Sequence, residues 1–336
     1  MDAAPIRRTA LRGSRVNDTD FDEFSYLSAQ AAEAGIDGPL PRAERLNLTL
    51  ADGRTLSALR YVPGADGGSA EATPVVTFLH GAGLNAHTWD TTILALGLPA
   101  LAIDLAGHGD SSWRDDHAYL ARVLGPDVVA ALTAWTDRPQ LLVGQSLGGL
   151  TAAAVAASRP DLVGELVVID ITPGVDPNAG PTQIREFFAG PTDWATRDEM
   201  VDRALAFGLG GTRGAAERGV FLNSRMRPDG RFEWKHHFAH LAAAMSASPE
   251  LAAAAEAQQD GVARVLSLSG WDDLAAVTAP VSLIRGDHGY VTGANAAEFQ
   301  EHVPSASVDV VASGHNVQEE IPVDLGARLR ALAGKG

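Results

Sequence analysis

Short apolar runs of three to five residues recur along the chain, and each one ends at a glycine or at a polar cluster. Helix-length segments separate most of them. Parallel strands buried on both faces give this pattern, because helices cover both sides of their sheet. The spacing fits repeated strand–helix–strand units. The runs that predict strands are Val75–Leu79, Ala100–Ile103, Leu141–Val143, Leu166–Ile169, Val281–Ile284 and Val308–Val311.

A different pattern precedes these runs. Leu46–Leu50 alternates apolar and polar residues, Asp52-Gly53 supplies a turn, and Leu56–Val62 returns, which predicts a β-hairpin. A shorter helical pattern at Phe21–Ala34 indicates an N-terminal extension packed on the surface.

The strand rhythm stops between Ile169 and Val281. We therefore expect a mainly helical insertion there, without sheet strands at Trp194 or Trp234. Three segments have helical character: Pro181–Ala189, Arg197–Phe207 and Pro249–Gln258.

These patterns divide the chain into three parts. Residues 1–40 form the N-terminal extension, residues 41–174 and 271–336 form one α/β core, and residues 175–270 form a helical cap over it. The expected fold class is α/β, with a mostly parallel central sheet flanked by helices.

Composition narrows the function. The chain has 336 residues, 46% of them hydrophobic and 20% charged, as in ordinary soluble globular proteins. Its net charge of −16 disfavours nucleic acids and anionic membranes as partners. With no cysteine, disulfides and thiolate chemistry are excluded. No apolar run approaches the length of a membrane span, and no signal peptide is evident, so the expected location is cytoplasmic.

The strongest chemical motif is Gly144-Gln145-Ser146-Leu147-Gly148, a G-x-S-x-G pattern between a predicted strand and a helical run. A nucleophile on such a sharp turn has strained backbone angles and needs small neighbours. A plain glycine-rich turn is the alternative, but the context on both sides favours Ser146 as a nucleophile.

A second glycine-rich turn, His80-Gly81-Ala82-Gly83, follows the first core strand. The backbone N–H of Ala82 could pair with that of Leu147 to bind an oxyanion. We expect His80 to brace this loop. His108, in a Gly–His–Gly sequence after the next strand, is assigned the same kind of structural role.

Ser313-Gly314-His315-Asn316 follows the last predicted strand, where a histidine can reach the serine as general base. Two carboxylates could orient His315. Asp170 ends the strand Leu166–Ile169, and Asp287 follows the strand Val281–Ile284.

Three histidines of the insertion, His236, His237 and His240, raise the possibility of a metal site. His236 and His240 lie one helical turn apart, but no third ligand has suitable spacing and no His-Glu-x-x-His motif occurs. We expect no metal and no cofactor.

The segments HGAG, DLAGHGDS, GQSLGG and SGHN occur in the order found in the α/β-hydrolase superfamily, which the chain resembles over about residues 45–175 and 270–335. The resemblance implies a parallel sheet, serine chemistry and a cap inserted after the sixth strand. Many members carry the acid after the seventh strand, where this chain has Gly289. The segment Asp170-Ile171-Thr172-Pro173 resembles instead those members whose acid follows the sixth strand. We therefore favour Asp170 over Asp287.

We interpret the chain as a serine hydrolase of a carboxylic ester, lactone or related acyl substrate, with Ser146, Asp170 and His315 as catalytic residues and Ala82 and Leu147 at the oxyanion. Two alternatives stay open: carbon–carbon bond hydrolysis or acyl transfer at the same residues, and a ligand-sensing receptor with slow turnover. The expected partner is a small, apolar acyl molecule, and the oligomeric state is left open. Aromatic residues of the insertion indicate either an apolar pocket or core packing: Phe187, Phe188, Trp194, Phe207, Phe221, Trp234 and Phe238.

Overall fold

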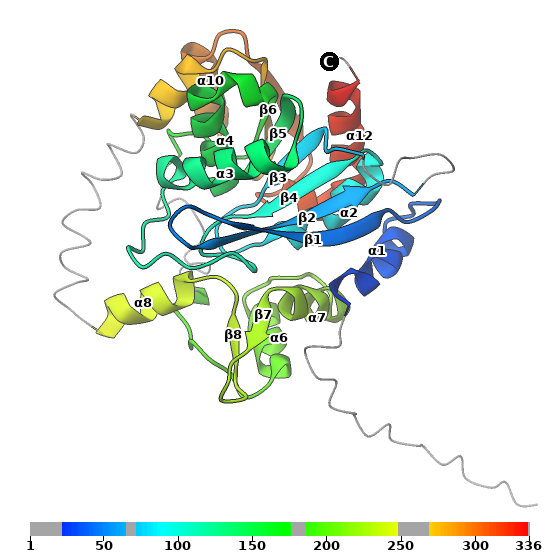
Figure 1. Cartoon of the computed structure of the whole chain (residues 1–336), viewed down its shortest axis with the longest axis vertical. Helices are drawn as coiled ribbons and strands as arrows, with labels where there is room; N and C mark the ends of the chain where they lie inside the picture. The colour runs from blue at the N-terminus through cyan, green and yellow to red at the C-terminus, as the bar shows by residue number, and fades with distance from the viewer. Residues whose placement is uncertain (1–21, 65–71, 176–185, 188, 248–268, 335–336) are drawn as a thin grey trace, which may run out of the picture.

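An eight-stranded sheet forms the centre of the protein (Figure 1). The computed structural model describes residues 22–64, 72–175, 186–187, 189–247 and 269–334. The strand order is β1-β2-β4-β3-β5-β6-β9-β10. The pairs β1/β2 and β2/β4 are antiparallel, and the other neighbours are parallel. The expected fold class, a mostly parallel sheet flanked by helices, is confirmed.

The strands of this sheet agree closely with the predicted runs, and the N-terminal hairpin is formed by β1 and β2. Their bounds are β1 Arg42–Thr49, β2 Thr55–Val62, β3 Val76–Leu79, β4 Ala100–Asp104, β5 Gln140–Gln145, β6 Val163–Ile169, β9 Val281–Gly286 and β10 Ser307–Val311. The helices around it are η2 Glu23–Tyr26, α1 Leu27–Glu33, η3 Ala86–Trp89, α2 Asp90–Leu96, α3 Ala121–Trp135, α4 Leu147–Ser158, η4 Pro160–Leu162, α10 Gly293–His302, α11 Val317–Glu320 and α12 Pro322–Ala333.

Both faces of the sheet are buried, which explains the continuous apolar runs. On β6, Leu166 and Val168 pack into one core with α3, α4 and α10, whereas Val167 and Ile169 pack into another with α1, α2 and α12. Alternate side chains of a strand point to opposite faces, so each buried strand must be apolar throughout. Figure 1 shows the two groups of helices on either side of the sheet.

Part of the chain between β6 and β9 leaves the sheet, and the described residues of this part lie at one end of it, at the bottom of Figure 1. We call its described residues, 186–187 and 189–247, the inserted segment. They have a small core of their own, which includes Met200, Val220 and Trp234. The elements are α6 Arg197–Ala206, α7 Arg213–Leu222, β7 Ser224–Met226, β8 Phe232–Trp234 and α8 Phe238–Ala247.

One expectation about this segment is wrong. Trp234 lies on β8, which pairs with β7 in a hairpin, and Trp194 forms an isolated β-bridge with Phe232. Phe232 and Trp234 belong to a two-stranded ribbon, and Trp194 bonds to the backbone of Phe232, so helical periodicity did not reveal these positions. The predicted helix at Arg197–Phe207 is present as α6, whereas Pro249–Gln258 and most of Pro181–Ala189 lie outside the described residues.

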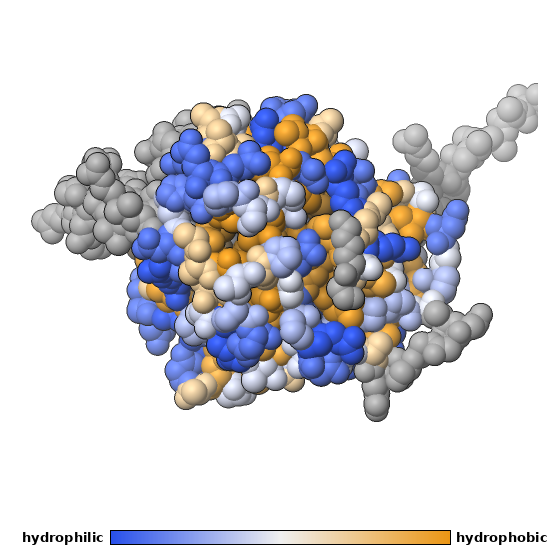
Figure 2. Space-filling view, turned by 90° about the horizontal axis from the view of Figure 1, so that it is seen from above, coloured by the Kyte–Doolittle hydropathy of each residue, from blue (hydrophilic) through white to orange (hydrophobic). Residues whose placement is uncertain are grey.

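Within the described part of the chain, no helix is both long enough and apolar enough to cross a bilayer. The face seen in Figure 2 carries hydrophilic residues around its rim and hydrophobic ones between them. Apolar atoms contribute more than half of a typical protein surface. This distribution therefore does not by itself mark a binding site.

A chain of buried charges connects η2 to the core. Arg45 of β1 donates to Glu23 Oε2 at 2.6 Å and to Asp104 Oδ2 at 2.8 Å. His87 lies 3.0 Å from both Glu23 and Asp90. Burial alone would lower the pKa of His87, but Asp90 and Glu23 outweigh burial and raise it to about 9. His87 is therefore protonated at neutral pH.

We expect His87→Gln to destabilise the protein in a pH-dependent way. Because the pKa of His87 is raised from 6.5 to about 9 on folding, its stabilisation is fully present below about pH 6.5 and is lost as the pH rises towards 9. Denaturant unfolding at pH 6, 7.5 and 9 should show the difference from wild type shrinking with pH. His288→Gln serves as the control, because that side chain is 70% exposed. A difference that stays constant across this range would contradict the assignment.

Candidate active site

Ser146 occupies a sharp turn between β5, which ends at Gln145, and α4, which begins at Leu147. Its backbone has φ 53° and ψ −121°, a conformation that costs a non-glycine residue on the order of 1–3 kcal/mol. The flanking glycines are required by space. A Cβ on Gly144 would lie 2.2 Å from the Gly148 oxygen, and one on Gly148 would lie 2.2 Å from the Leu79 oxygen.

The carboxylate of Asp170 is fully buried and lies directly behind His315. The Nδ1 atom of His315 is 2.8 Å from Asp170 Oδ2. The N–H groups of Gly286 and Tyr290 donate to the same carboxylate at 3.0 and 2.6 Å. A carboxylate can only accept here, so Nδ1 carries the proton and Nε2 is left as the basic nitrogen of the ring.

Two further contacts fix the orientation of His315. The Tyr290 ring stacks on the imidazole with centroids 3.7 Å apart and planes within 11°. Gln145 Nε2 donates to the His315 carbonyl at 3.2 Å. Gln145, the last residue of β5, therefore precedes Ser146 in the chain and also holds the backbone of His315 in place.

Asp287 lies away from this cluster. Its side chain is half exposed, accepts from the Ser313 N–H at 3.1 Å and pairs with His288. Gly289 explains the difference between the two acids. A Cβ at position 289 would lie 2.3 Å from both oxygens of Asp170. The glycine therefore leaves room for a carboxylate that arrives from β6.

The loop after β3 passes beside Ser146, since a Cβ on Gly81 would lie 3.2 Å from the Ser146 Cβ. His80 is buried, donates from Nδ1 to the Gly81 carbonyl at 2.8 Å and accepts the Leu105 N–H at Nε2. Burial lowers the pKa of His80, which keeps Nε2 free to accept. The Leu84 N–H also bonds the Gly81 carbonyl, at 3.2 Å. His80 thus braces the loop.

These bonds determine where the Ala82 N–H points. The Gly81 carbonyl and the Ala82 N–H belong to one trans peptide and point in opposite directions, so fixing the carbonyl fixes the N–H. Leu147 is the first residue of α4, and an N–H at that position has no acceptor within its own helix. Ala82 and Ser146 line the same cavity, and Leu147 follows Ser146 directly in the chain.

Ser146, Ala82 and His315 line one cavity of about 750 Å³. Its far wall comes from the inserted segment and includes Phe187, Leu209, Val220 and Trp234. Of the aromatic residues expected there, Phe187 and Trp234 line the cavity, Trp194 and Phe207 pack against the core of the inserted segment, and Phe188 lies outside the described residues.

His108, His236 and His237, which also stand out in the sequence, pack against other rings of the fold. His108 is buried, its Nδ1 lies 3.1 Å from the Ala106 oxygen, and its ring packs edge-on against His80. His236 stacks on Trp234, and His237 stacks on Trp113. Among the described residues, no three or more His, Cys, Asp or Glu side chains are grouped so that they could hold a metal ion.

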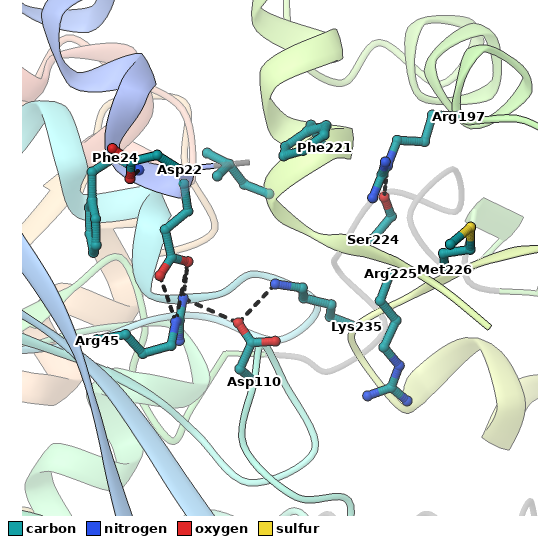
Figure 3. Close-up of a pocket in the computed structure, with 12 residues that line it drawn as sticks. Asp22, Phe24, Arg45, Asp110, Arg197, Phe221, Ser224, Arg225, Met226 and Lys235 are labelled. Carbon is teal, nitrogen blue, oxygen red and sulfur yellow. Dashed lines mark hydrogen bonds and ion pairs between the residues drawn. The ribbon is translucent and has the colours of Figure 1, made fainter. Parts of the chain in front are cut away.

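A second hollow of about 580 Å³ lies between η2 and the inserted segment (Figure 3). Its charged side chains largely satisfy one another. Lys235 pairs with Asp110 at 2.8 Å, Asp110 pairs with Arg45 at 3.2 Å, and Arg45 pairs with Glu23. It contains no arrangement like that around Ser146, and we regard it as a seam between core and inserted segment.

Sequence reasoning missed several residues around the site. Tyr290 carries no local signal beyond its place after Gly289, and its stacking on His315 depends on how two loops meet. Gln145 stood inside the recognised motif, but its bond to the His315 carbonyl joins segments 170 residues apart. Asn223, which bonds the loop after β3, was not considered.

The chain is similar to known proteins over most of its length. The sequence model of the alpha/beta hydrolase family matches residues 78–328. The chain is 36% identical over 313 residues to the esterase Rv0045c of Mycobacterium tuberculosis, covering 90% of this chain and 93% of that protein. A solved structure of that esterase superposes with a TM-score of 0.75 and 35% identity, covering 94% of this chain and 99% of the other. The sn-1-specific diacylglycerol lipase ABHD11 of Mus musculus is 26% identical over 266 residues, 75% of this chain and 78% of that protein.

Proposed function

The chain belongs to the alpha/beta hydrolase family, and we propose that it hydrolyses a carboxylic ester or lactone, with Ser146 as nucleophile, His315 as general base and Asp170 as the acid that orients it. The single observation that carries this proposal is the 2.8 Å contact between His315 Nδ1 and the buried Asp170, in a ring that lines the same cavity as Ser146. The 36% identity with an esterase supports ester hydrolysis as the reaction.

The proposed reaction uses the basic Nε2 of His315. It takes the Ser146 hydroxyl proton as the oxygen attacks the ester carbonyl carbon, and Asp170 stabilises the imidazolium that forms. The N–H groups of Ala82 and Leu147 stabilise the negative charge that develops on the carbonyl oxygen. His315 then protonates the leaving alcohol. Water, activated by the same imidazole, attacks the acyl-enzyme and releases the acid, so no cofactor is required.

We assign the inserted segment the role of a cap that shapes the acyl site. It contributes apolar wall residues to the cavity, among them Phe187, Leu209, Val220 and Trp234. A cavity closed on this side excludes water from the reacting carbonyl and favours an apolar acyl group. Other residues that line the cavity are polar, among them Thr88, Gln318 and Glu319. The substrate we propose is therefore a small molecule with an apolar acyl chain.

The first prediction concerns the nucleophile. Ser146→Ala should lower the turnover of a short p-nitrophenyl ester at least about a thousandfold without loss of fold, because no other group can replace the serine oxygen. A fluorophosphonate probe should label Ser146 in the wild type, as located by peptide mass spectrometry. Labelling at another residue, or full activity of the Ser146→Ala variant, would contradict the assignment of Ser146 as the nucleophile. Ligand binding without measurable turnover of any ester would favour a receptor instead.

The second prediction concerns the acid. Asp170→Asn should lower turnover by up to about ten-thousandfold, the loss known for a protease triad aspartate, whereas Asp287→Asn should retain most of it. Because a Cβ at position 289 lies against the Asp170 oxygens, the double variant Asp170→Gly, Gly289→Asp returns a carboxylate to nearly the same place. It should recover at least about tenfold over Asp170→Gly alone. If both variants fold, and Asp170→Asn keeps its activity while Asp287→Asn loses it, the acid is Asp287.

The third prediction concerns the acyl site. Trp234 lines the cavity, whereas Trp194 packs against the inserted segment away from it. Trp234→Ala should therefore shift the preferred p-nitrophenyl ester towards longer acyl chains, because it enlarges the cavity. Trp194→Ala, the matched control, should leave the chain-length profile unchanged while lowering thermal stability. Identical profiles for both variants and the wild type would count against an acyl site bounded by Trp234.

A further inference from the structure

Asn223 stands where the inserted segment meets the loop after β3. It follows α7, and its own N–H closes that helix by donating to the Gly219 carbonyl at 3.0 Å. Its carbonyl accepts the Lys235 N–H at 2.8 Å, so its backbone is also attached to the end of β8. The position of the Asn223 side chain is therefore set by two elements of the inserted segment at once.

The side chain of Asn223 reaches out of the inserted segment and into the core. Its Nδ2 donates to the Gly83 carbonyl at 2.8 Å, and its Oδ1 accepts from Asn85 Nδ2 at 3.3 Å. Asn85 Nδ2 also donates to the Leu222 carbonyl at 3.0 Å, and Asn85 Oδ1 accepts the His87 N–H at the start of η3. The two asparagines thus form a reciprocal bridge between α7 and the loop that carries Ala82.

This bridge completes the bracing of Ala82. On the core side, His80 and the Leu84 N–H hold the Gly81 carbonyl. On the other side, Asn223 holds the carbonyl of Gly83, a buried residue at φ +78° whose conformation is open to glycine but costly for other residues. Ala82 lies between these two fixed carbonyls, and its N–H is one of the two donors that we propose for the oxyanion.

We propose that Asn223 is a positioning residue for the oxyanion hole, so that docking of the inserted segment and alignment of the Ala82 N–H occur together. The inference rests on the proposed function, since it assigns Ala82 a role in the chemical step. An oxyanion donor must lie within about 2.7–3.1 Å of the oxygen in the transition state, so a small shift of the loop is costly. Such a donor acts on charge that is absent from the bound ester, and its misplacement lowers kcat more than it alters KM.

The test compares Asn223→Asp and Asn223→Ala with a matched control. Aspartate keeps the size of the side chain but presents an oxygen to the Gly83 carbonyl. Alanine removes both side-chain bonds of Asn223 and leaves the bond from Asn85 Nδ2 to the Leu222 carbonyl. Lys235→Gln is the control, because it breaks another contact between inserted segment and core, the 2.8 Å pair with Asp110 seen in Figure 3, without touching the loop after β3.

The readouts are kcat and KM for a short p-nitrophenyl ester, and the inhibition constant of a trifluoromethyl ketone, which the serine converts into a tetrahedral oxyanion. Both Asn223 variants should lower kcat about tenfold or more and leave KM within about twofold of the wild-type value. The loss of kcat should stay below the roughly hundredfold loss expected when an oxyanion donor is deleted. The inhibition constant should rise in parallel with the loss of kcat/KM. Lys235→Gln should stay within about twofold of wild type in all three values.

Several outcomes would overturn the proposal. An unchanged kcat with a raised KM would make Asn223 part of the substrate pocket, and an equal loss in Lys235→Gln would reduce its role to general attachment of the inserted segment. Asn85→Asp keeps the cap on the His87 N–H and removes only the donor of the bridge, so it supplies a second test if an Asn223 variant fails to fold. It should lower kcat in the same direction, and normal activity would refute the bridge. Absence of ester turnover and of Ser146 labelling in the wild type would instead show that the proposed function itself has failed.

Discussion

The buried carboxylate of Asp170 is the constraint around which the rest of the site is arranged. An ionised group taken out of water is costly unless it is paired and hydrogen-bonded. Here the N–H groups of Gly286 and Tyr290 and the imidazole of His315 supply the partners. Gly286 is the last residue of β9, Tyr290 lies in the loop after β9, His315 lies in the loop after β10, and Asp170 follows β6. One charge therefore gathers three strand ends and sets the direction of the His315 ring.

A second constraint is the close approach of α4 to the strands beneath it. Gly144 and Gly148 allow the helix to begin within van der Waals contact of the backbone of β5 and β3, and the strained Ser146 turn follows from that approach. The same proximity brings the loop after β3 beside Ser146, where His80 turns the Gly81 peptide. The proposed nucleophile and the proposed oxyanion donors thus depend on one packing arrangement rather than on separate features.

The inserted segment contacts the core or lines its cavity at several points. Trp234 and Phe187 bound the cavity, Lys235 pairs with Asp110 at the seam, and the Asn223 bridge reaches the loop that carries Ala82. Only the last of these contacts connects the segment to the proposed chemistry.

The sequence by itself determined where the strands lie along the chain, the apolar character of each buried strand and the turn that carries Ser146. These features depend on local periodicity and on glycine spacing. It also directed attention to Asp170, although only as one of two carboxylates. The tertiary structure decided what depends on distant segments meeting: that Gly289 leaves space for Asp170, that Tyr290 stacks on His315, and that Asn223 reaches Gly83. It also corrected the expectation for Trp234, which pairs within the β7–β8 hairpin, and for Trp194, which forms an isolated β-bridge with Phe232. Contacts between residues of different loops and strands leave no periodic trace in a single sequence, and for that reason only the folded chain shows them.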